Sequence, residues 1–402
     1  MIVGIISEYN PFHNGHLYQI EKIREAFGNN TKIIAVMSGN YVQRGGIAIA
    51  DKALRARCAL ECGVNLVLEV PFPYSMSSAE FFARSGVHIL NSLGCVDYLA
   101  FGSESGDIEA LTRVAKAMLT EEYNTLLKSL LDDDKKTGYP EACELALKKI
   151  LMTDGPVLDF SPNNILAIEY IKALLTSDSH IRPYTIMRKG NDFSSFNFVN
   201  GDIQSATAIR YAINNKDISA LEYVPNITKP LILNAINNGD FPCDENRLSS
   251  AVIASFRLNS PKSSSEIHDA TGGLYNRLKE LSFETNNIEN LVRAAESKKF
   301  TRARIKRAIF NSFLGVTSSQ VKELPMFTQL LAADIEGRSI LKAIKNQGSI
   351  SILTKPSDTD SLSQTAKMQK SISDTADSVF QLAKPIPKNG NSALRFTPFV
   401  KK

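Results

Sequence analysis

The first half of the chain alternates short apolar runs with longer amphipathic stretches, and this order restricts the folds open to it. Runs typical of buried strands occur at Ile2–Ile6, Lys32–Met37, Asn65–Val70, Val96–Phe101 and Tyr184–Met187. Amphipathic helical patterns lie between them, at Leu17–Phe27, Ala50–Cys62 and Ala79–Leu93. Alternating strands and helices are typical of a parallel sheet covered on both faces. We therefore predict an α/β fold built on a Rossmann-like parallel sheet.

The chain has 402 residues, which is long enough for two domains of about 200 residues each. Residues 107–160 interrupt the strand–helix rhythm, and we interpret them as a helical insertion. Beyond residue 217 strand signals fade, and helical patterns follow at Leu248–Leu258, Gly273–Leu281, Asn287–Glu296 and Arg302–Leu314. We predict an α/β domain over 1–216 and a mainly helical domain over 217–402. Residues 355–378 are rich in Ser, Thr, Asp and Lys and are expected to form a surface loop.

Composition excludes several classes of protein. With 43% apolar and 22% charged residues, the chain is typical of a globular protein, not a disordered one. No apolar run approaches the roughly 18 residues of a membrane span, and Met1–Glu8 lacks the basic segment of a signal peptide. Five scattered cysteines suit reduced thiols, so we predict a cytoplasmic protein. Cys58 and Cys62 have helical spacing; a buried face is favoured over a shared metal because no histidine lies nearby.

The sharpest motif lies where the first expected strand meets the first helix. The chain there reads Asn10-Pro11-Phe12-His13-Asn14-Gly15-His16. In an open parallel sheet, ligands bind at the carboxyl ends of strands, where helix N-termini attract phosphate. Two imidazoles at this turn can donate hydrogen bonds to a triphosphate and stabilise the charge that grows on departing pyrophosphate. Gly15 leaves the backbone open to a close ligand.

Ordinary loop histidines are the alternative interpretation. Function is favoured because the chain has only five histidines and two of them flank a glycine at this turn. A zinc site is disfavoured because no third ligand lies close in sequence. A second pattern, Ser205-Ala206-Thr207-Ala208-Ile209-Arg210, suits a serine-capped helix N-terminus followed by a phosphate-binding arginine. A plain helix cap would explain this pattern alone, but beside the histidines we favour phosphate contact.

His13-x-Gly15-His16 after a first strand resembles the HxGH signature of the nucleotidyltransferase superfamily, and the Ser205–Arg210 pattern resembles its later phosphate motif. Further stretches are similar to the bacterial tRNA(Met) cytidine acetate ligase family: Glu8–His16, Met37–Gly45, Phe101–Glu104 and Ser161–Leu166. Proteins of that family are of about this length, so the resemblance spans the whole chain. It implies that acetate attacks the α-phosphate of ATP to give acetyl-AMP. The wobble cytidine of elongator tRNA(Met) then takes the acetyl group, forming 4-acetylcytidine.

The resemblance also implies roles for individual residues. His13, His16 and Arg210 would be catalytic. The ATP-binding set would comprise Ser7, Glu8, Tyr9, Asn10, Pro11, Phe12, His13, Asn14, Gly15, His16, Leu17, Tyr18, Gln19, Ile20, Gly102, Asn163, Arg188 and Ser205.

Two further members of this set have structural alternatives. Asn163 is interpreted equally well as a cap of the helix expected from Ile165, whereas for Arg188, directly after an apolar run, function is favoured over a surface charge. The family's aromatic–His pair after this arginine is replaced here by Asn191-Asp192-Phe193-Ser194, so we expect no histidine role there.

A turn after the second expected strand is a candidate for the acetate or α-phosphate contact. It contains Ser38, Gly39 and Asn40, and Gln43 and Arg44 follow within reach of a carboxylate. A structural turn with a solvated arginine is an equally weighted alternative.

Basic residues crowd into positions 293–307, although the net charge of the chain is only +4. Seven cations face the single acid Glu296 in this stretch: Arg293, Lys298, Lys299, Arg302, Arg304, Lys306 and Arg307. Such a run repels itself unless phosphates neutralise it, as RNA would. Phe300 and Tyr275 offer faces for stacking an unpaired base, and Arg277 and Lys279 extend the surface. The alternative is a solvated helix face; with the family resemblance we predict tRNA binding by Lys298, Lys299, Arg302, Arg304, Lys306 and Arg307.

Two other functions remain as alternatives to the ligase. A small-molecule adenylyltransferase making a coenzyme would share both motifs but leave the helical half and the basic run unexplained. A nucleotide-sensing RNA-binding protein without catalysis is disfavoured by the intact His13, Gly15, His16 and Arg210. We expect ATP and acetate as substrates, elongator tRNA(Met) as partner, and Mg²⁺ held mainly by the phosphates. No resident metal, membrane contact or obligate protein partner is predicted.

Overall fold

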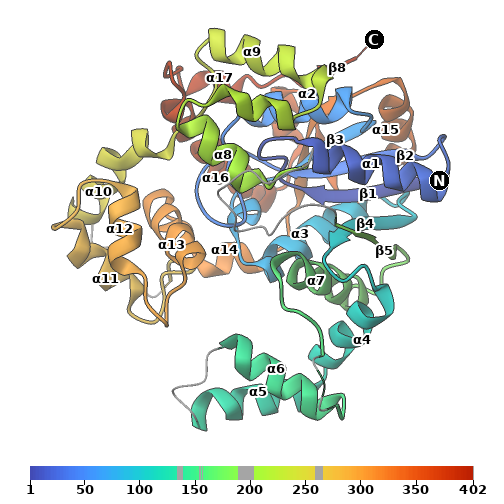
Figure 1. Ribbon diagram of the computed structural model, residues 1–402. Helices are drawn as coiled ribbons and strands as arrows, with labels where there is room; N and C mark the ends of the chain where they lie inside the picture. The colour runs from blue at the N-terminus through green and yellow to red at the C-terminus, as the bar shows by residue number, and fades with distance from the viewer. Residues whose placement is uncertain (134–138, 154, 156, 189–202, 259–265, 402) are drawn as a thin grey trace.

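A mixed β-sheet with helices on both faces forms the centre of the molecule (Figure 1). The computed structural model describes residues 1–133, 139–153, 155, 157–188, 203–258 and 266–401. Across the described residues the strand order is β5-β4-β1-β2-β3-β6-β7, and β8 pairs with β6. The strands are β1 (Ile2–Ser7), β2 (Lys32–Ser38), β3 (Leu66–Val70), β4 (Tyr98–Ser103), β5 (Arg182–Met187), β6 (Phe327–Ala333), β7 (Ser351–Leu353) and β8 (Phe399–Val400).

The helices occupy most of the remaining described chain. None of them combines the length and apolar character that crossing a membrane requires. They are α1 (Asn14–Phe27), α2 (Lys52–Glu61), α3 (Ala79–Ser92), α4 (Ile108–Met118), α5 (Glu121–Asp133), α6 (Tyr139–Ile150), α7 (Pro162–Thr176), α8 (Ala206–Asn214), α9 (Lys229–Asn237), α10 (Ser249–Leu258), α11 (Leu274–Ser282), α12 (Ile288–Ala295), α13 (Arg302–Leu314), α14 (Ser318–Lys322), α15 (Ile335–Gln347), α16 (Gln364–Phe380) and α17 (Asn391–Leu394).

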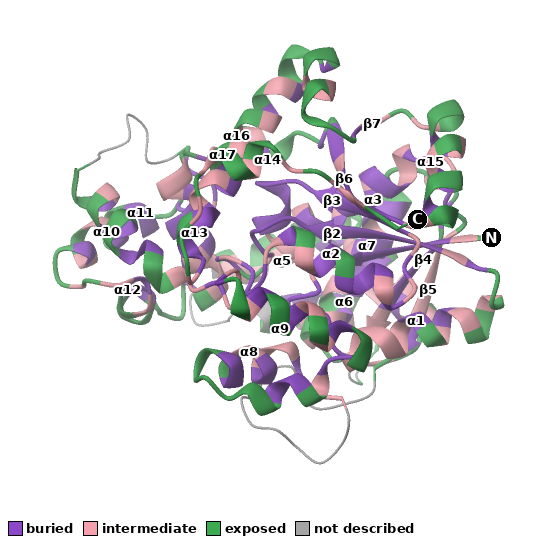
Figure 2. Ribbon diagram, turned by 90° about the horizontal axis from the view of Figure 1, so that it is seen from above, coloured by how far each residue is buried: buried purple, intermediate pink, exposed green. Residues whose placement is uncertain are grey.

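Strands β1 to β5 pair in parallel, as the sequence predicts. Their side chains alternate between the two faces of the sheet, because successive residues of a strand point in opposite directions. Ile34 and Leu68 pack towards α3 and α7, whereas Ile33 and Val67 pack towards α1 and α2. Figure 2 shows that the sheet is largely buried among its helices. Parallel pairing places the carboxyl ends of β1, β2 and β4 at one edge of the sheet.

The region expected to form a helical insertion contains α4, α5 and α6. Helices α5 and α6 pack against each other and lie at the end of the molecule away from α8 and α9 (Figure 1). The region is therefore helical, and its status as an insertion stays a prediction.

Three strands lie among the helices of the described residues beyond 217, where the sequence signals for strands fade. Strand β6 pairs antiparallel with β3, and β7 and β8 pair with β6. The β6 sequence Phe-Thr-Gln-Leu-Leu-Ala-Ala is a short apolar run, which periodicity alone does not separate from a helix. Its partner strand β3 also lies far earlier in the chain, so no local signal marks the pairing.

The prediction of a surface loop at residues 355–378 is wrong. Helix α16 covers most of it, after a short 3-10 turn at Pro356–Ser361. Its buried face consists largely of small or polar residues, including Ala366, Gln369, Ser373 and Ala376 at helical spacing. The polar composition therefore concealed a regular helical period.

The helices α10 to α13 form a separate group beside the sheet, named here the helical lobe (residues 249–314) (Figure 1). It has its own apolar core, which includes Leu278, Leu291 and Ile309. Tyr41 and Phe72 from the α/β part belong to the same core. The segment that follows β2 therefore packs against the helical lobe.

Candidate active site

Two histidines cap the helix that follows β1. The chain turns through Tyr9, which has a φ of 47°, and enters α1 at Asn14. His13 Nδ1 accepts a hydrogen bond from the Gly15 backbone N–H at 3.0 Å, and His16 Nδ1 accepts one from the His13 backbone N–H at 3.2 Å. The two imidazoles thus form a reciprocal capping box, with ring centroids 3.8 Å apart.

This arrangement determines which nitrogen of each ring carries the proton. A neutral imidazole has one acceptor and one donor, so rings that accept at Nδ1 present N–H at Nε2. Burial, then the charges of Arg188 and Arg210, lower the pKa of His13 to about 3. Burial, then His13 and Arg188, lower the pKa of His16 well below its usual value. Both rings are therefore neutral hydrogen-bond donors at physiological pH, suited to stabilising an anion.

Long-range ¹H–¹⁵N NMR of the nucleotide-free protein tests this assignment. We expect His13 and His16 to show the Nε2–H tautomer at pH 8 and to remain neutral at pH 5, because a lowered pKa keeps the neutral form dominant down to that lower pKa. His13→Ala and His16→Ala spectra assign the two resonances by subtraction. Protonation of either ring between pH 6 and 7 would contradict the burial and the capping geometry.

Two glycines of the predicted ATP set make room for protein side chains. A Cβ atom on Gly15 would lie 2.9 Å from Cε1 of His13. A Cβ atom on Gly102 would lie 3.2 Å from Cγ of Arg188. We predicted that Gly15 opens the backbone to a ligand; on its Cβ side the structure places the His13 ring instead.

Helix α8 brings the second motif to the histidine loop. Ser205 caps the helix, accepting from the Ala208 N–H at 3.1 Å, as predicted. The Arg210 guanidinium donates to the Asn10 carbonyl at 2.7 Å and to Thr207 Oγ1 at 3.1 Å. Residues about 200 positions apart in sequence therefore meet at one loop.

The β4 and α7 motifs also meet each other. Glu104 Oε1 accepts from the Asn163 side chain at 2.6 Å, and its Oε2 accepts from the Asn164 N–H at 2.8 Å. Burial acts to raise the pKa of Glu104, but hydrogen bonds from Asn163, Ser161 and the backbone hold it below its usual value. Arg188 donates to Asn163 Oδ1 at 3.3 Å. Asn163 is thus not the helix cap, which is Ser161, but a bridge between Glu104 and Arg188.

The candidate acetate turn after β2 is more deeply built into the protein than expected. Asn40 donates to Asp377 at 2.8 Å and accepts from the Lys52 N–H at 2.8 Å. Its amide therefore serves a structural network, which favours the structural alternative for this residue. Ser38 is fully buried, whereas Arg44 is exposed and lies within electrostatic range of Glu8.

The sequence analysis did not identify two buried cations of α2, Lys52 and Arg55. Lys52 lies 2.8 Å from Glu69 and 2.5 Å from Asp377, and all three side chains are nearly inaccessible. Arg55 donates to backbone carbonyls of the segments after β1 and β2. The one available signal was Glu69, a lone acid within the apolar run Leu66–Val70, because a buried carboxylate requires a partner.

Comparison with known proteins agrees with this geometry. Residues 1–393 match the HIGH nucleotidyl transferase family. A tRNA(Met) cytidine acetate ligase of Thermoanaerobacter sp. (strain X514) is 38% identical over 384 residues, which are 92% of this chain and 93% of that protein. The chain belongs to the tRNA(Met) cytidine acetate ligase family.

Solved structures of this family also have a fold close to that of this chain. The crystal structure of Thermotoga maritima TmcAL in its apo form I is 30% identical and matches with a TM-score of 0.93. The same protein bound with alpha-thio ATP matches with a TM-score of 0.90, and in both cases 100% of this chain and 99% of the other are covered. These relatives confirm the predicted fold class. They do not favour a coenzyme adenylyltransferase, because they are cytidine acetate ligases along nearly their whole length.

The basic run of this family member is neutralised more fully than its sequence suggests. Arg307 is buried, 2.7 Å from Asp269, and donates to the Gln43 carbonyl at 3.4 Å. Lys306 pairs with Glu245 at 2.7 Å, and Arg302 pairs with Glu289 and Glu296. Neutralisation that the sequence interpretation assigned to RNA alone therefore comes from Asp269, Glu245 and Glu289 outside the run and from Glu296 within it.

Other parts of the predicted RNA surface also differ from expectation. Phe300 and Tyr275 are each 6% exposed, so neither ring face is open to a base. Arg304 and Lys299 donate to the carbonyls of Thr271 and Gly272. Lys298 is exposed. Of the six cations predicted to bind tRNA, Lys298, Lys299 and Arg302 are exposed, Arg304 and Lys306 are half-buried, and Arg307 is buried.

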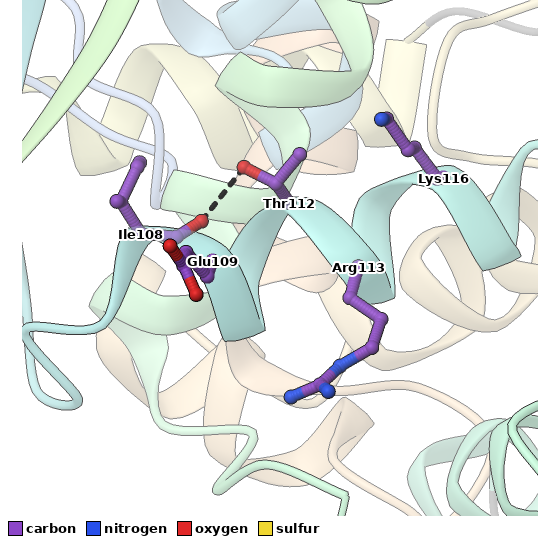
Figure 3. A pocket seen from close by; sticks show the side chains of 5 residues that line it. All are labelled: Ile108, Glu109, Thr112, Arg113 and Lys116. Carbon is purple, nitrogen blue, oxygen red and sulfur yellow. Dashed lines mark hydrogen bonds between the residues drawn. The ribbon is translucent and has the colours of Figure 1, made fainter.

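The described residues contain no group of three or more His, Cys, Asp or Glu side chains placed to hold a metal ion. Cys58 and Cys62 are both buried, as expected. The substituted segment Asn191–Ser194 lies outside the described residues. A shallow hollow on α4, lined by Ile108, Glu109, Thr112, Arg113 and Lys116, includes none of the predicted site residues (Figure 3).

Proposed function

We propose that this protein is an ATP-dependent ligase that activates acetate as acetyl-AMP and transfers the acetyl group to the wobble cytidine of elongator tRNA(Met). In the first step an acetate oxygen attacks the α-phosphorus of ATP, and pyrophosphate leaves. In the second step the exocyclic N4 amine attacks the acetyl carbonyl, AMP leaves, and the amine gives up a proton. The product is 4-acetylcytidine.

The pair of neutral imidazoles at the start of α1 carries this proposal. Their Nε2–H groups and the guanidinium of Arg210 can donate to the phosphates of ATP, and the dipole of α1 favours negative charge at this end of the helix. Pyrophosphate gains charge as it departs, so donors fixed in advance stabilise the transition state more than the ground state. A lowered histidine pKa suits such a donor, because the ring is not required to exchange a proton.

The nucleotide would lie across the carboxyl ends of β1 and β4. Its proposed contacts are the Ser7–Ile20 segment, Gly102, Asn163, Arg188, Ser205 and Arg210, while Ser38, Gly39, Gln43 and Arg44 remain candidates for acetate or α-phosphate. Ile20 is part of the core, so within the segment it supports the loop. Mg²⁺ would enter with ATP and bind mainly phosphate oxygens and water.

The tRNA would approach the helical lobe. We assign the domain over 217–402 to RNA binding, with β6 to β8 as its contribution to the sheet. The proposal places the enzyme in the cytoplasm, where its tRNA substrate is found, and requires no protein partner.

Exposed cations of the lobe are expected to act on RNA affinity alone. Reversing charge in Lys298→Glu/Arg302→Glu should weaken tRNA binding at least tenfold at low salt and reduce the salt slope of log K by about two. Adenylate formation should stay near wild type, because neither side chain contacts the histidine loop. The matched control is Arg113→Glu/Lys116→Glu, which changes the net charge equally on α4. Equal weakening by both pairs would point to bulk charge and contradict a lobe site.

Incorporation of labelled acetate into bulk bacterial tRNA, with and without ATP, tests the function directly. ATP-dependent label confined to one elongator methionine tRNA supports the proposal. Absence of label together with acetate-independent ATP–pyrophosphate exchange would overturn it.

A further inference from the structure

Helix α2 carries an arginine that is almost completely buried, with 1% of its surface exposed. Arg55 Nε donates to the Ala50 carbonyl at 2.9 Å. Its Nη1 donates to the carbonyls of Glu8 at 2.6 Å and Ser38 at 3.0 Å, and Nη2 donates to the Gly39 carbonyl. The acceptors of these four bonds are all backbone carbonyls.

The acceptors belong to the segments that leave neighbouring strands. Glu8 follows β1, and Ser38 and Gly39 lie at the end of β2. Here the two parallel strands separate, so their carbonyls lose ladder partners and need other donors. A planar guanidinium offers donors in several directions at once, which a lysine ammonium cannot reproduce. Burial lowers the pKa of Arg55 to about 10, so the group stays charged at neutral pH.

Further hydrogen bonds join the segment after β1 to the segment after β2. The Glu8 carboxylate accepts from the Gln43 N–H at 2.7 Å. Asn10 Oδ1 accepts from the Ile49 N–H at 2.8 Å. Several hydrogen bonds therefore connect the segment from Gly39 to Ala50 with the histidine loop. Arg55 binds both segments at the point where they leave the sheet.

We propose that Arg55 is a positioning residue for adenylate formation. It sets the distance between the histidine loop, which would hold the triphosphate, and the Ser38–Gly39 turn, which would hold acetate. Bond formation between the acetate oxygen and the α-phosphorus requires close alignment, and a displacement of about 1 Å can lower a rate about 100-fold. This inference rests on the proposed function.

Arg55→Lys tests the role, because it keeps the positive charge and removes the planar guanidinium with its several donors. We expect kcat for acetate-dependent ATP–pyrophosphate exchange to fall about 100-fold, with KM for ATP changed less than about threefold. Transfer of acetyl from preformed acetyl-AMP to tRNA should stay within about threefold of wild type, because the bond that Arg55 aligns is already made. Arg24→Lys is the control, since Arg24 also donates to a backbone carbonyl, that of Gly63 at 2.9 Å, on the other end of α1.

A purely structural role would give a different pattern. It would lower the melting temperature and both half-reactions in proportion to the folded fraction, and that result, or an unchanged kcat, would overturn the proposal. Arg55→Met is a second test, in case the lysine side chain finds new acceptors. Its kcat for exchange is measured per folded molecule. Failure of the wild-type protein to form acetyl-AMP would instead refute the proposed function, so the two failures are distinguishable.

Discussion

Replacing His16 with alanine is expected to lower acetate-dependent ATP–pyrophosphate exchange by about 100- to 1,000-fold. The variant loses an Nε2–H donor aimed at the proposed phosphates, and that donor matters most when pyrophosphate carries its developing charge. Binding of tRNA should remain near wild type, because the lobe cations lie on other elements. Exchange kinetics and tRNA filter binding measure the two effects separately.

Alanine at position 16 also removes a helix cap, since His16 Nδ1 accepts from the His13 N–H. His16→Asn separates the two roles: its amide oxygen can take the place of Nδ1, whereas nothing reaches the position of Nε2. We expect the asparagine variant to regain stability but not exchange. His180→Ala, at an exposed histidine of the same chain, is the control for histidine loss. Recovery of exchange in His16→Asn would show that capping, not phosphate donation, is what His16 supplies.

The sheet and the histidine loop could be predicted because local sequence carries their signals. Buried parallel strands such as Lys32–Ser38 read as continuous apolar runs, and a helix start after one of them marks a ligand site. Ser205 was identifiable as a cap for the same reason: its hydrogen bond to Ala208 spans only three residues.

Features that depend on contacts across the fold left weaker signals. The acids that pair with Lys306 and Arg307, which are Glu245 and Asp269, lie in other segments, so the sequence of the basic run gave no sign of them. The sequence analysis gave no role to Arg55 and Lys52, because charged residues are seldom buried without partners and their partners lie in distant segments: the ends of β1 and β2, β3 and α16. Only the position of Glu69 inside an apolar strand hinted at them.

Lys52→Met is expected to lower the free energy of unfolding by about 3–5 kcal/mol. Lys52 faces two carboxylates, those of Glu69 and Asp377, with side-chain exposures of 2% and 6%. Methionine fills a similar volume but leaves both acids without their counter-charge in a site of low dielectric constant. Chemical denaturation with urea at pH 8 measures the loss.

The loss should shrink on acidification. Burial raises the pKa of Glu69, and Lys52 opposes that rise, so removing Lys52 raises this pKa further. A carboxyl whose pKa is higher in the folded state binds more protons there than in the unfolded chain. Stability then falls as pH rises from the ordinary carboxyl pKa through the raised one. The difference between the variant and wild type is therefore expected to be smaller at pH 5 than at pH 8.

We attribute the stability loss of Lys52→Met to the burial of the two carboxylates and not to the loss of an ion pair as such. A surface ion pair of the same chain tests this attribution. Lys32 lies 2.7 Å from Glu336 at the surface, so Lys32→Met removes a contact of the same type where water screens it. That variant should lose far less stability than Lys52→Met, with little dependence on pH. Adding Glu69→Gln and Asp377→Asn to Lys52→Met should recover most of the stability, because the uncompensated charges are gone. If Lys32→Met and Lys52→Met lose the same amount, or if the added amides recover nothing, then the cost lies in packing around α2 and not in the buried carboxylates.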